Sequence, residues 1–321
     1  MKQPVRRNKI IASGLIVIGI LVAAIGFFSG AKFSIIKTDD GFKAVGKEDR
    51  KHEEWEYKEF KSLEIDLADA DIEIIPSNEY KLVIERMEGS EIEQQVKNNT
   101  LIIKDKKSNP ILSFSMNFSG TIQKTIIKVY IPKDSDFVDV NIANDFGDVK
   151  INGMSTDILL VHSNDGDVLI EDNKSNRLTI QNKYGDITAT NVQTTNLTIE
   201  SNDGNTKLNN MDIAENADLI NLFGDTILSD FTSKGTKLES KDGDINIKGK
   251  LLGQTMIESN FGDVNLALAN KESELSYDIQ NDFGDISINE TEIVSKASKS
   301  VDSEDKIEIQ SKDGDVKLTL E

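Results

Sequence analysis

The chain has 321 residues, a net charge of −19 and no cysteine, which excludes disulfides, thiolate metal sites and cysteine nucleophiles. The first 31 residues carry a net charge of +4, so the remaining 290 carry −23. Because a body of this charge repels phosphate backbones, we expect no nucleic acid among its partners.

An uncharged stretch of nineteen residues, 10–28, predicts a single-pass transmembrane helix, because it would extend roughly 28 Å and match the hydrocarbon thickness. The lipid bilayer is therefore one expected partner. Four basic residues precede the stretch, which predicts a cytoplasmic tail at 1–9 and an extracytoplasmic body. A signal peptide cleaved near Ser29-Gly30-Ala31 is the alternative, although its apolar segment would exceed the usual ~7–15 residues.

Two further segments separate this stretch from the repeats. Residues 29–58 are charged and predict an irregular juxtamembrane stalk. Residues 59–138 contain segments in which apolar and polar residues alternate, and these predict an N-terminal β-cap. Within this cap, residues 67–74 match the repeat described next with Ala70 in the glycine position, so we expect a degenerate first repeat.

A 19-residue repeat fills residues 139–321 and predicts an all-β chain that folds as a β-solenoid of about nine repeats. Each repeat reads Asn or Ser, any residue, aromatic or Asp, Gly, Asp, and then alternating aliphatic residues. The aliphatic positions five before and four after each glycine would face the core, as Ile180, Ile199 and Leu238 do. A polar insertion, 291–306, is expected to be a loop. The predicted structural turn residues are Gly147, Asp148, Gly166, Asp167, Gly185, Asp186, Gly204, Asn205, Gly224, Asp225, Gly243, Asp244, Gly262, Asp263, Gly284, Asp285, Gly314 and Asp315.

The turn residues carry three further expectations. Each glycine should take a positive φ that a Cβ would resist, and the next Asp or Asn should bond its own neighbouring backbone. We expect one repeat in each coil of the solenoid; the alternative is a 38-residue coil of two repeats, in which like residues would stack on like. The residue before the glycine alternates between aromatic and Asp over seven repeats, and burial of the aromatic rings at a core edge is favoured over a sugar-stacking ladder.

The serial turns S-x-D-G-D-V and N-x-F-G-D-I, the upstream segment ADIEI and the apolar N-terminal stretch resemble the bacterial putative-adhesin family over roughly 59–321. These are β-strand-repeat proteins of unknown biochemical function, and they include LiaG-like proteins associated with cell-envelope stress. The resemblance implies a β-repeat fold and supplies no active-site residues.

The sequence predicts no catalytic, cofactor-binding or metal-binding residue and no cofactor, since its two histidines, His52 and His162, are far apart in the sequence. We therefore expect no enzyme but a membrane-anchored, adhesin-like structural or interaction protein at the bacterial cell envelope, with a role in envelope stress. Its partner would be a cell-wall polymer or an envelope protein. The alternatives are a glycan-binding or glycan-active β-helix protein and a calcium-stabilised repeat module. The oligomeric state is left open.

Overall fold

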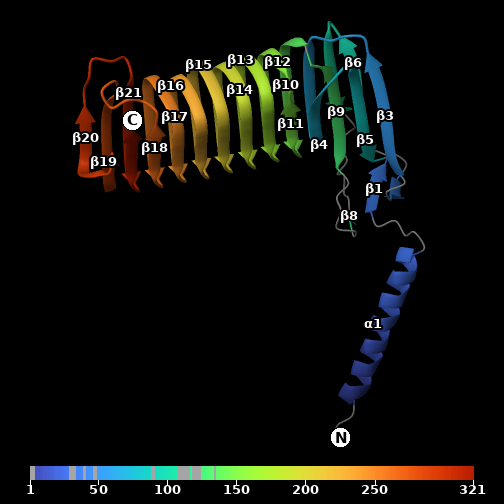
Figure 1. The fold of residues 1–321 in the computed structure, drawn as a ribbon. Coiled ribbons are helices and arrows are strands. Elements are labelled where there is room, and N and C mark those ends of the chain that lie inside the picture. Colours follow the sequence, from blue (N-terminus) through green and yellow to red (C-terminus); the bar gives the residue numbers. More distant parts are fainter. Residues whose placement is uncertain are drawn as a thin grey trace. The chain divides into compact units, whose positions relative to one another are not determined.

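The computed structural model divides the chain into two compact units (Figure 1). The described residues are 4–28, 34–38, 41–45, 49–87, 91–106, 116–117, 124–133 and 135–321. The first unit comprises residues 1–51, 86–90 and 107–123. The second unit comprises residues 52–85, 91–106 and 124–321.

The first unit contains the helix α1 (Pro4–Phe28) and a three-stranded antiparallel sheet. The central strand β1 (Ser34–Thr38) pairs on one side with β2 (Gly41–Val45) and on the other with β8 (Met116–Asn117). Part of the segment that was expected to be an irregular stalk is therefore built from strands.

A helix does cover residues 10–28, but the prediction that it spans a membrane is wrong. Along the described part of the chain, no helix combines the length and the apolar character that crossing a bilayer requires. The alternative cleavage site at Ser29-Gly30-Ala31 lies outside the described residues.

The second unit begins with a β-cap built around β4, whose long run of alternating side chains is buried on one face. Strands β7 and β9 pair with β4 in parallel, while β5 pairs with β9 and β6 with β7 in antiparallel fashion. The side chains of Trp55 and Tyr57 on β3 pack partly buried against the core. The cap strands are β3 (Arg50–Tyr57), β4 (Ser62–Ser77), β5 (Tyr80–Met87), β6 (Ile92–Lys97), β7 (Thr100–Asp105) and β9 (Thr125–Pro132).

The repeats continue β4 as a stack of parallel strands, seen side by side in Figure 1. Each strand pairs with the residues one repeat further along, so that Val168 lies opposite Ile187 and Ile180 opposite Ile199. This offset of 19 residues confirms one repeat per coil. The strands are β10 (Asp136–Phe146), β11 (Val149–Asn152), β12 (Ser155–Asp165), β13 (Val168–Tyr184), β14 (Ile187–Asp203), β15 (Thr206–Phe223), β16 (Thr226–Asp242), β17 (Ile245–Phe261), β18 (Val264–Leu268), β19 (Ser276–Ile288), β20 (Thr291–Lys299), β21 (Lys306–Asp313) and β22 (Val316–Leu320).

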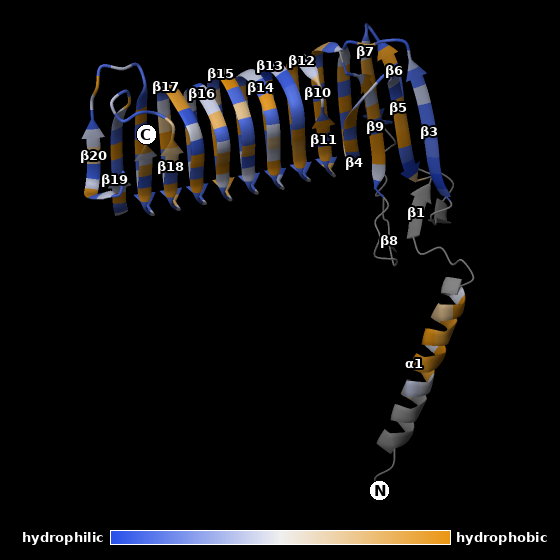
Figure 2. Cartoon of the chain, in the orientation of Figure 1, coloured by the Kyte–Doolittle hydropathy of each residue, from blue (hydrophilic) through white to orange (hydrophobic). Residues whose placement is uncertain are grey.

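The core is a set of aliphatic columns that run through the coils. Every residue five before and four after a turn glycine is buried, and Ile180, Ile199 and Leu238 are at most 1% exposed. Figure 2 shows the apolar and polar residues alternating along these strands. The expected degenerate first repeat is also confirmed, because β4 continues both columns with Ile65 beside Ile142.

The order of the last three coils in space differs from their order in the sequence. Strands β21 and β22 pair on one side with β17 and β18 and on the other side with β19. The last repeat of the chain is therefore inserted between two coils that precede it. The insertion 291–306 is not simply a loop, because residues 291–299 form β20, which pairs antiparallel with β19 and covers the end coil.

Candidate functional site

The predicted turn glycines line one edge of the stack, which we call the turn edge; it comprises the residues from three before to one after each glycine. All nine glycines have a positive φ, between 108° and 146°. A Cβ added to Gly204 would lie 2.1 Å from the carbonyl oxygen of Gly185. Glycine therefore allows both the left-handed backbone and the close stacking of neighbouring turns.

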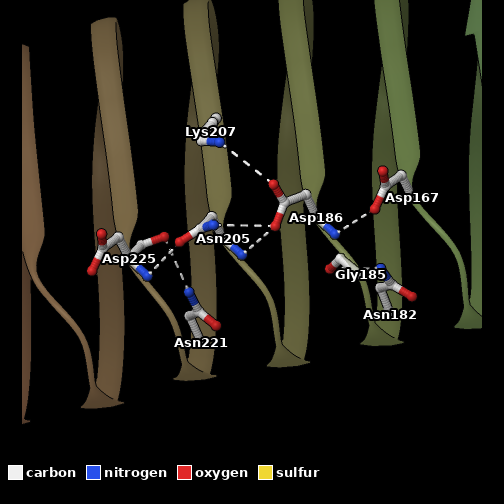
Figure 3. A network of polar contacts seen from close by, with 8 residues as sticks. All are labelled: Asp167, Asn182, Gly185, Asp186, Asn205, Lys207, Asn221 and Asp225. Atoms are coloured by element: carbon white, nitrogen blue, oxygen red, sulfur yellow. Dashed lines mark hydrogen bonds and ion pairs between the residues drawn. The ribbon is translucent and has the colours of Figure 1, made fainter.

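The column after the glycines forms a continuous hydrogen-bond ladder (Figure 3). The N–H of Asp186 donates to Oδ1 of Asp167 at 2.9 Å, and the N–H of Asn205 donates to Oδ1 of Asp186 at 2.8 Å. These carboxylates were expected to bond their own turns, and in the described stack they accept the backbone N–H of the next coil instead. The remaining donor–acceptor pairs of this ladder are Asp148–Asp71, Asp167–Asp148, Asp225–Asn205, Asp244–Asp225, Asp263–Asp244, Asp315–Asp263 and Asp285–Asp315.

Repulsion between carboxylates is reduced in the middle of this ladder. Asn205 interrupts the row of carboxylates, and Lys207 reaches Oδ2 of Asp186 at 3.4 Å. The backbone N–H of Asn205, followed by the charge of Lys207, holds the pKa of Asp186 below its ordinary value. The ladder thus keeps a charged row of side chains at the surface while each carboxylate also links two coils.

The column three residues before the glycines consists of buried Asn and Ser side chains, and its asparagines hydrogen-bond to the backbone of the turns. Nδ2 of Asn182 donates to the carbonyl oxygens of Gly166 and Gly185, both at 3.0 Å. Asn144 makes the equivalent bonds to Ala70 and Gly147. Because these carbonyls belong to adjacent coils, Asn144 and Asn182 each crosslink two turns.

The column immediately before the glycines alternates between aromatic and Asp along the whole stack. In the sequence the alternation ends with Phe261, Phe283 and Asp313. In the structure Asp313 lies between Phe261 and Phe283, because the last coil is inserted there. The spatial order is Asp69, Phe146, Asp165, Tyr184, Asp203, Phe223, Asp242, Phe261, Asp313 and Phe283.

The expectation that the aromatic rings are buried at a core edge is wrong. The exposed fractions are 50% for Phe146, 54% for Tyr184, 41% for Phe223, 52% for Phe261 and 72% for Phe283. The reason is geometric. The column of aromatic rings lies two positions further along the strand than the buried Asn and Ser column, which places the rings beyond the edge of the core. The rings and the aspartates together form an exposed row.

A second corner of each coil was missed in the sequence. Six residues after the glycine, Asp172, Asn191 and Asn210 have φ values of 52°, 57° and 52°, which asparagine and aspartate tolerate better than most residues. Their side chains also form a ladder, since Asn191 donates to Asp172 and Asn210 to Asn191, both at 2.8 Å. The signal for this corner is the recurrence of Asp, Asn or Gly at that one position.

The two histidines lie in different parts of the second unit and contact different residues. Nδ1 of His162 lies 3.1 Å from Oε1 of Gln181, which stacks on it one coil further on. His52 lies in a cap strand, 2.8 Å from Oε1 of Glu54. Among the described residues, no group of three or more His, Cys, Asp or Glu is arranged to hold a metal ion.

Two carboxyl groups beside the first coil have altered pKa values that the sequence did not predict. Burial raises the pKa of Asp69 and of Asp105 above the ordinary value. Asp105 accepts the backbone N–H of Ala68 at 2.7 Å, which opposes the effect of burial. Asp69 lies in β4 and Asp105 in β7, and both side chains remain exposed enough to be solvated.

Comparisons with known proteins found similar solved structures and a matching family model. The crystal structure of a putative adhesin from Bacteroides fragilis is 14% identical and has a TM-score of 0.41, with 85% of this chain and 97% of the other covered. That of a putative lipid binding protein from Parabacteroides distasonis is 13% identical, with a TM-score of 0.47 and coverage of 85% and 98%. No curated protein matches the chain. The Toastrack DUF4097 family model matches residues 60–319, and the chain therefore belongs to that family.

Proposed function

We propose that this protein is a non-enzymatic interaction protein of the bacterial cell envelope, with its second unit outside the cytoplasm. The observation that carries this proposal is the exposed row of aromatic and aspartate side chains along the turn edge. Large exposed aromatic side chains that recur in one line are typical of a surface that contacts a partner.

The repeat itself favours binding over catalysis. A catalytic site needs a few groups whose environments differ, such as two carboxylates with separated pKa values. The turn edge instead offers nearly the same environment in each coil. Such a surface makes many weak and equivalent contacts, which suits a partner that is itself repetitive.

The negative charge of the turn edge indicates which kinds of partner can bind there. The turn edge carries Asp residues in both the column before and the column after the glycines, and the chain beyond residue 31 has a net charge of −23. A strongly anionic partner would be repelled at this edge. A neutral or basic envelope polymer, or an envelope protein with a basic face, fits these charges.

The test is sedimentation of the full-length protein with purified bacterial cell walls. We expect wall-dependent sedimentation that falls when Tyr184 and Phe261 are both replaced by Ser. Replacing Ile158 by Ser should leave it unchanged, because Ile158 is 39% exposed but lies away from the turn edge.

The same samples test the absence of enzyme activity. No soluble reducing sugar should be released from the walls over the time of the binding assay. Failure to bind walls, or release of reducing sugar that is lost on replacing one pair of acids, would contradict the proposal.

A further inference from the structure

The turn edge has a repeat distance that constrains what it binds. Parallel strands lie about 4.8 Å apart, so the aromatic rings of alternate coils recur about every 9.6 Å. Five rings lie in this line, from Phe146 to Phe283, without an interruption in spatial order. We call this set of five the aromatic ladder.

Charge alone does not account for the aromatic ladder. Carboxylates stacked in every coil would repel each other, so an Asp in every second coil is understandable. Serine or threonine would separate those aspartates equally well. The positions between them hold Phe or Tyr, each 41% to 72% exposed, although exposed aromatic area is unfavourable in water.

We infer that the aromatic ladder binds a neutral, extended, β-1,4-linked polysaccharide, an inference that rests on the proposed function. In such a polymer every sugar is flipped relative to the one before, so the same face returns every second sugar. That two-sugar repeat is comparable in length with two coils. The apolar C–H face of a sugar packs on the electron-rich face of an aromatic ring.

The aspartates between the rings supply the polar half of the recognition. Asp165, Asp203 and Asp242 are exposed and lie between successive rings of the aromatic ladder. A carboxylate accepts hydrogen bonds from sugar hydroxyls, and charge-assisted bonds of this kind are stronger than neutral ones. The same carboxylates repel sugars that carry acid groups, which selects a neutral polymer.

The central ring carries an additional contact. Nζ of Lys241 lies 4.8 Å from the centroid of the Phe223 ring, and Phe223 is the least exposed of the five. Lys241 comes from the next coil and covers part of this ring in the free protein. A sugar that stacks on Phe223 either uses the uncovered face or displaces the lysine, whose ammonium then donates to a hydroxyl.

The number of rings makes the inference testable by position. A hexasaccharide spans three two-sugar repeats and therefore three rings. Five rings in a line offer three such positions, and all three include Phe223. Replacing Phe223 by Leu leaves two separate pairs of rings, whereas replacing Phe146 by Leu leaves four consecutive rings.

The experiment is calorimetric titration of the full-length protein with N-acetylglucosamine oligomers of two, four and six β-1,4-linked sugars. Each added ring should strengthen binding about fivefold, which corresponds to about 1 kcal/mol. Phe223→Leu should weaken hexamer binding about fivefold, whereas Phe146→Leu should weaken it less than twofold. A β-1,4-linked mannuronate hexamer, which carries carboxylates, should bind less tightly than the neutral hexamer.

Each other result overturns the inference. Equal losses for the two variants would show independent rings instead of a ladder, and no binding at millimolar hexamer would exclude the polysaccharide. A change in the sedimentation coefficient of the free protein on Phe223→Leu would show that the ladder joins copies of this chain. If walls still bind in any of these cases, the proposed function stands and only this inference fails.

Discussion

Replacing Gly204 by Val tests how tightly the coils depend on the glycine column. Gly204 has a φ of 136°, and a Cβ there would lie 2.1 Å from the carbonyl oxygen of Gly185. Holding a side chain at such a φ costs about 1–3 kcal/mol. Forcing the neighbouring coil away costs about as much again, so the free energy of unfolding should fall by about 4 kcal/mol.

The assay is urea unfolding followed by far-ultraviolet circular dichroism. With a slope of about 2 kcal/mol per molar urea, the loss corresponds to a midpoint lowered by about 2 M. The control is His162→Ala, which removes one hydrogen bond to Gln181 from a half-buried position and should lower the midpoint by about 0.3 M. Equal midpoints for the two variants would refute the argument that the glycines permit stacking.

Three further predictions concern the other contacts. Asn182→Ala should lower the free energy of unfolding by about 2 kcal/mol in the same urea assay, because it removes buried bonds to two turns. Asp186→Ala should destabilise the protein at pH 7 more than Asp186→Asn does. Since its folded pKa is depressed, the advantage of wild type over Asp186→Asn should disappear as the pH falls through that pKa. Cysteines at Asn265 and Lys317, which are paired neighbours, should form a disulfide on oxidation, whereas cysteines at Asn265 and Ser287 should not; gel mobility distinguishes them.

Much of the fold could be predicted because the repeat keeps a fixed distance between glycine and core. Ile180 and Ile199 occupy the same position in successive repeats, so a single period-2 pattern determines which face is buried. The degenerate first repeat was found in the same way, since Ala70 stands where later repeats have glycine. Prediction succeeded wherever the information lay within one repeat.

The features that were missed depend on contacts between coils. Whether Asp186 bonds its own turn or the next coil depends on the spacing of strands, which the residues of one turn do not contain. Whether Tyr184 is buried depends on how far the core extends along the edge. The insertion of the last coil left only one trace in the sequence, the interrupted alternation at Phe261, Phe283 and Asp313.

Aspartate occupies nearly every coil in the column after the turn glycines but only every second coil in the column before them, and the difference has a physical reason. At about 4.8 Å, two carboxylates in water repel each other by about 1 kcal/mol. In the column after the glycines, each carboxylate accepts an N–H from the next coil, as Asp167 does from Asp186, and this bond offsets the repulsion. In the column before the glycines, the carboxylates of Asp165 and Asp203 accept no hydrogen bond from a neighbouring coil within the described stack; only their backbone carbonyl oxygens do. There the aspartates lie two coils apart, a distance of about one Debye length at physiological salt, which weakens their repulsion. Because the aspartates occupy every second coil, the aromatic rings in the remaining coils also recur every second coil.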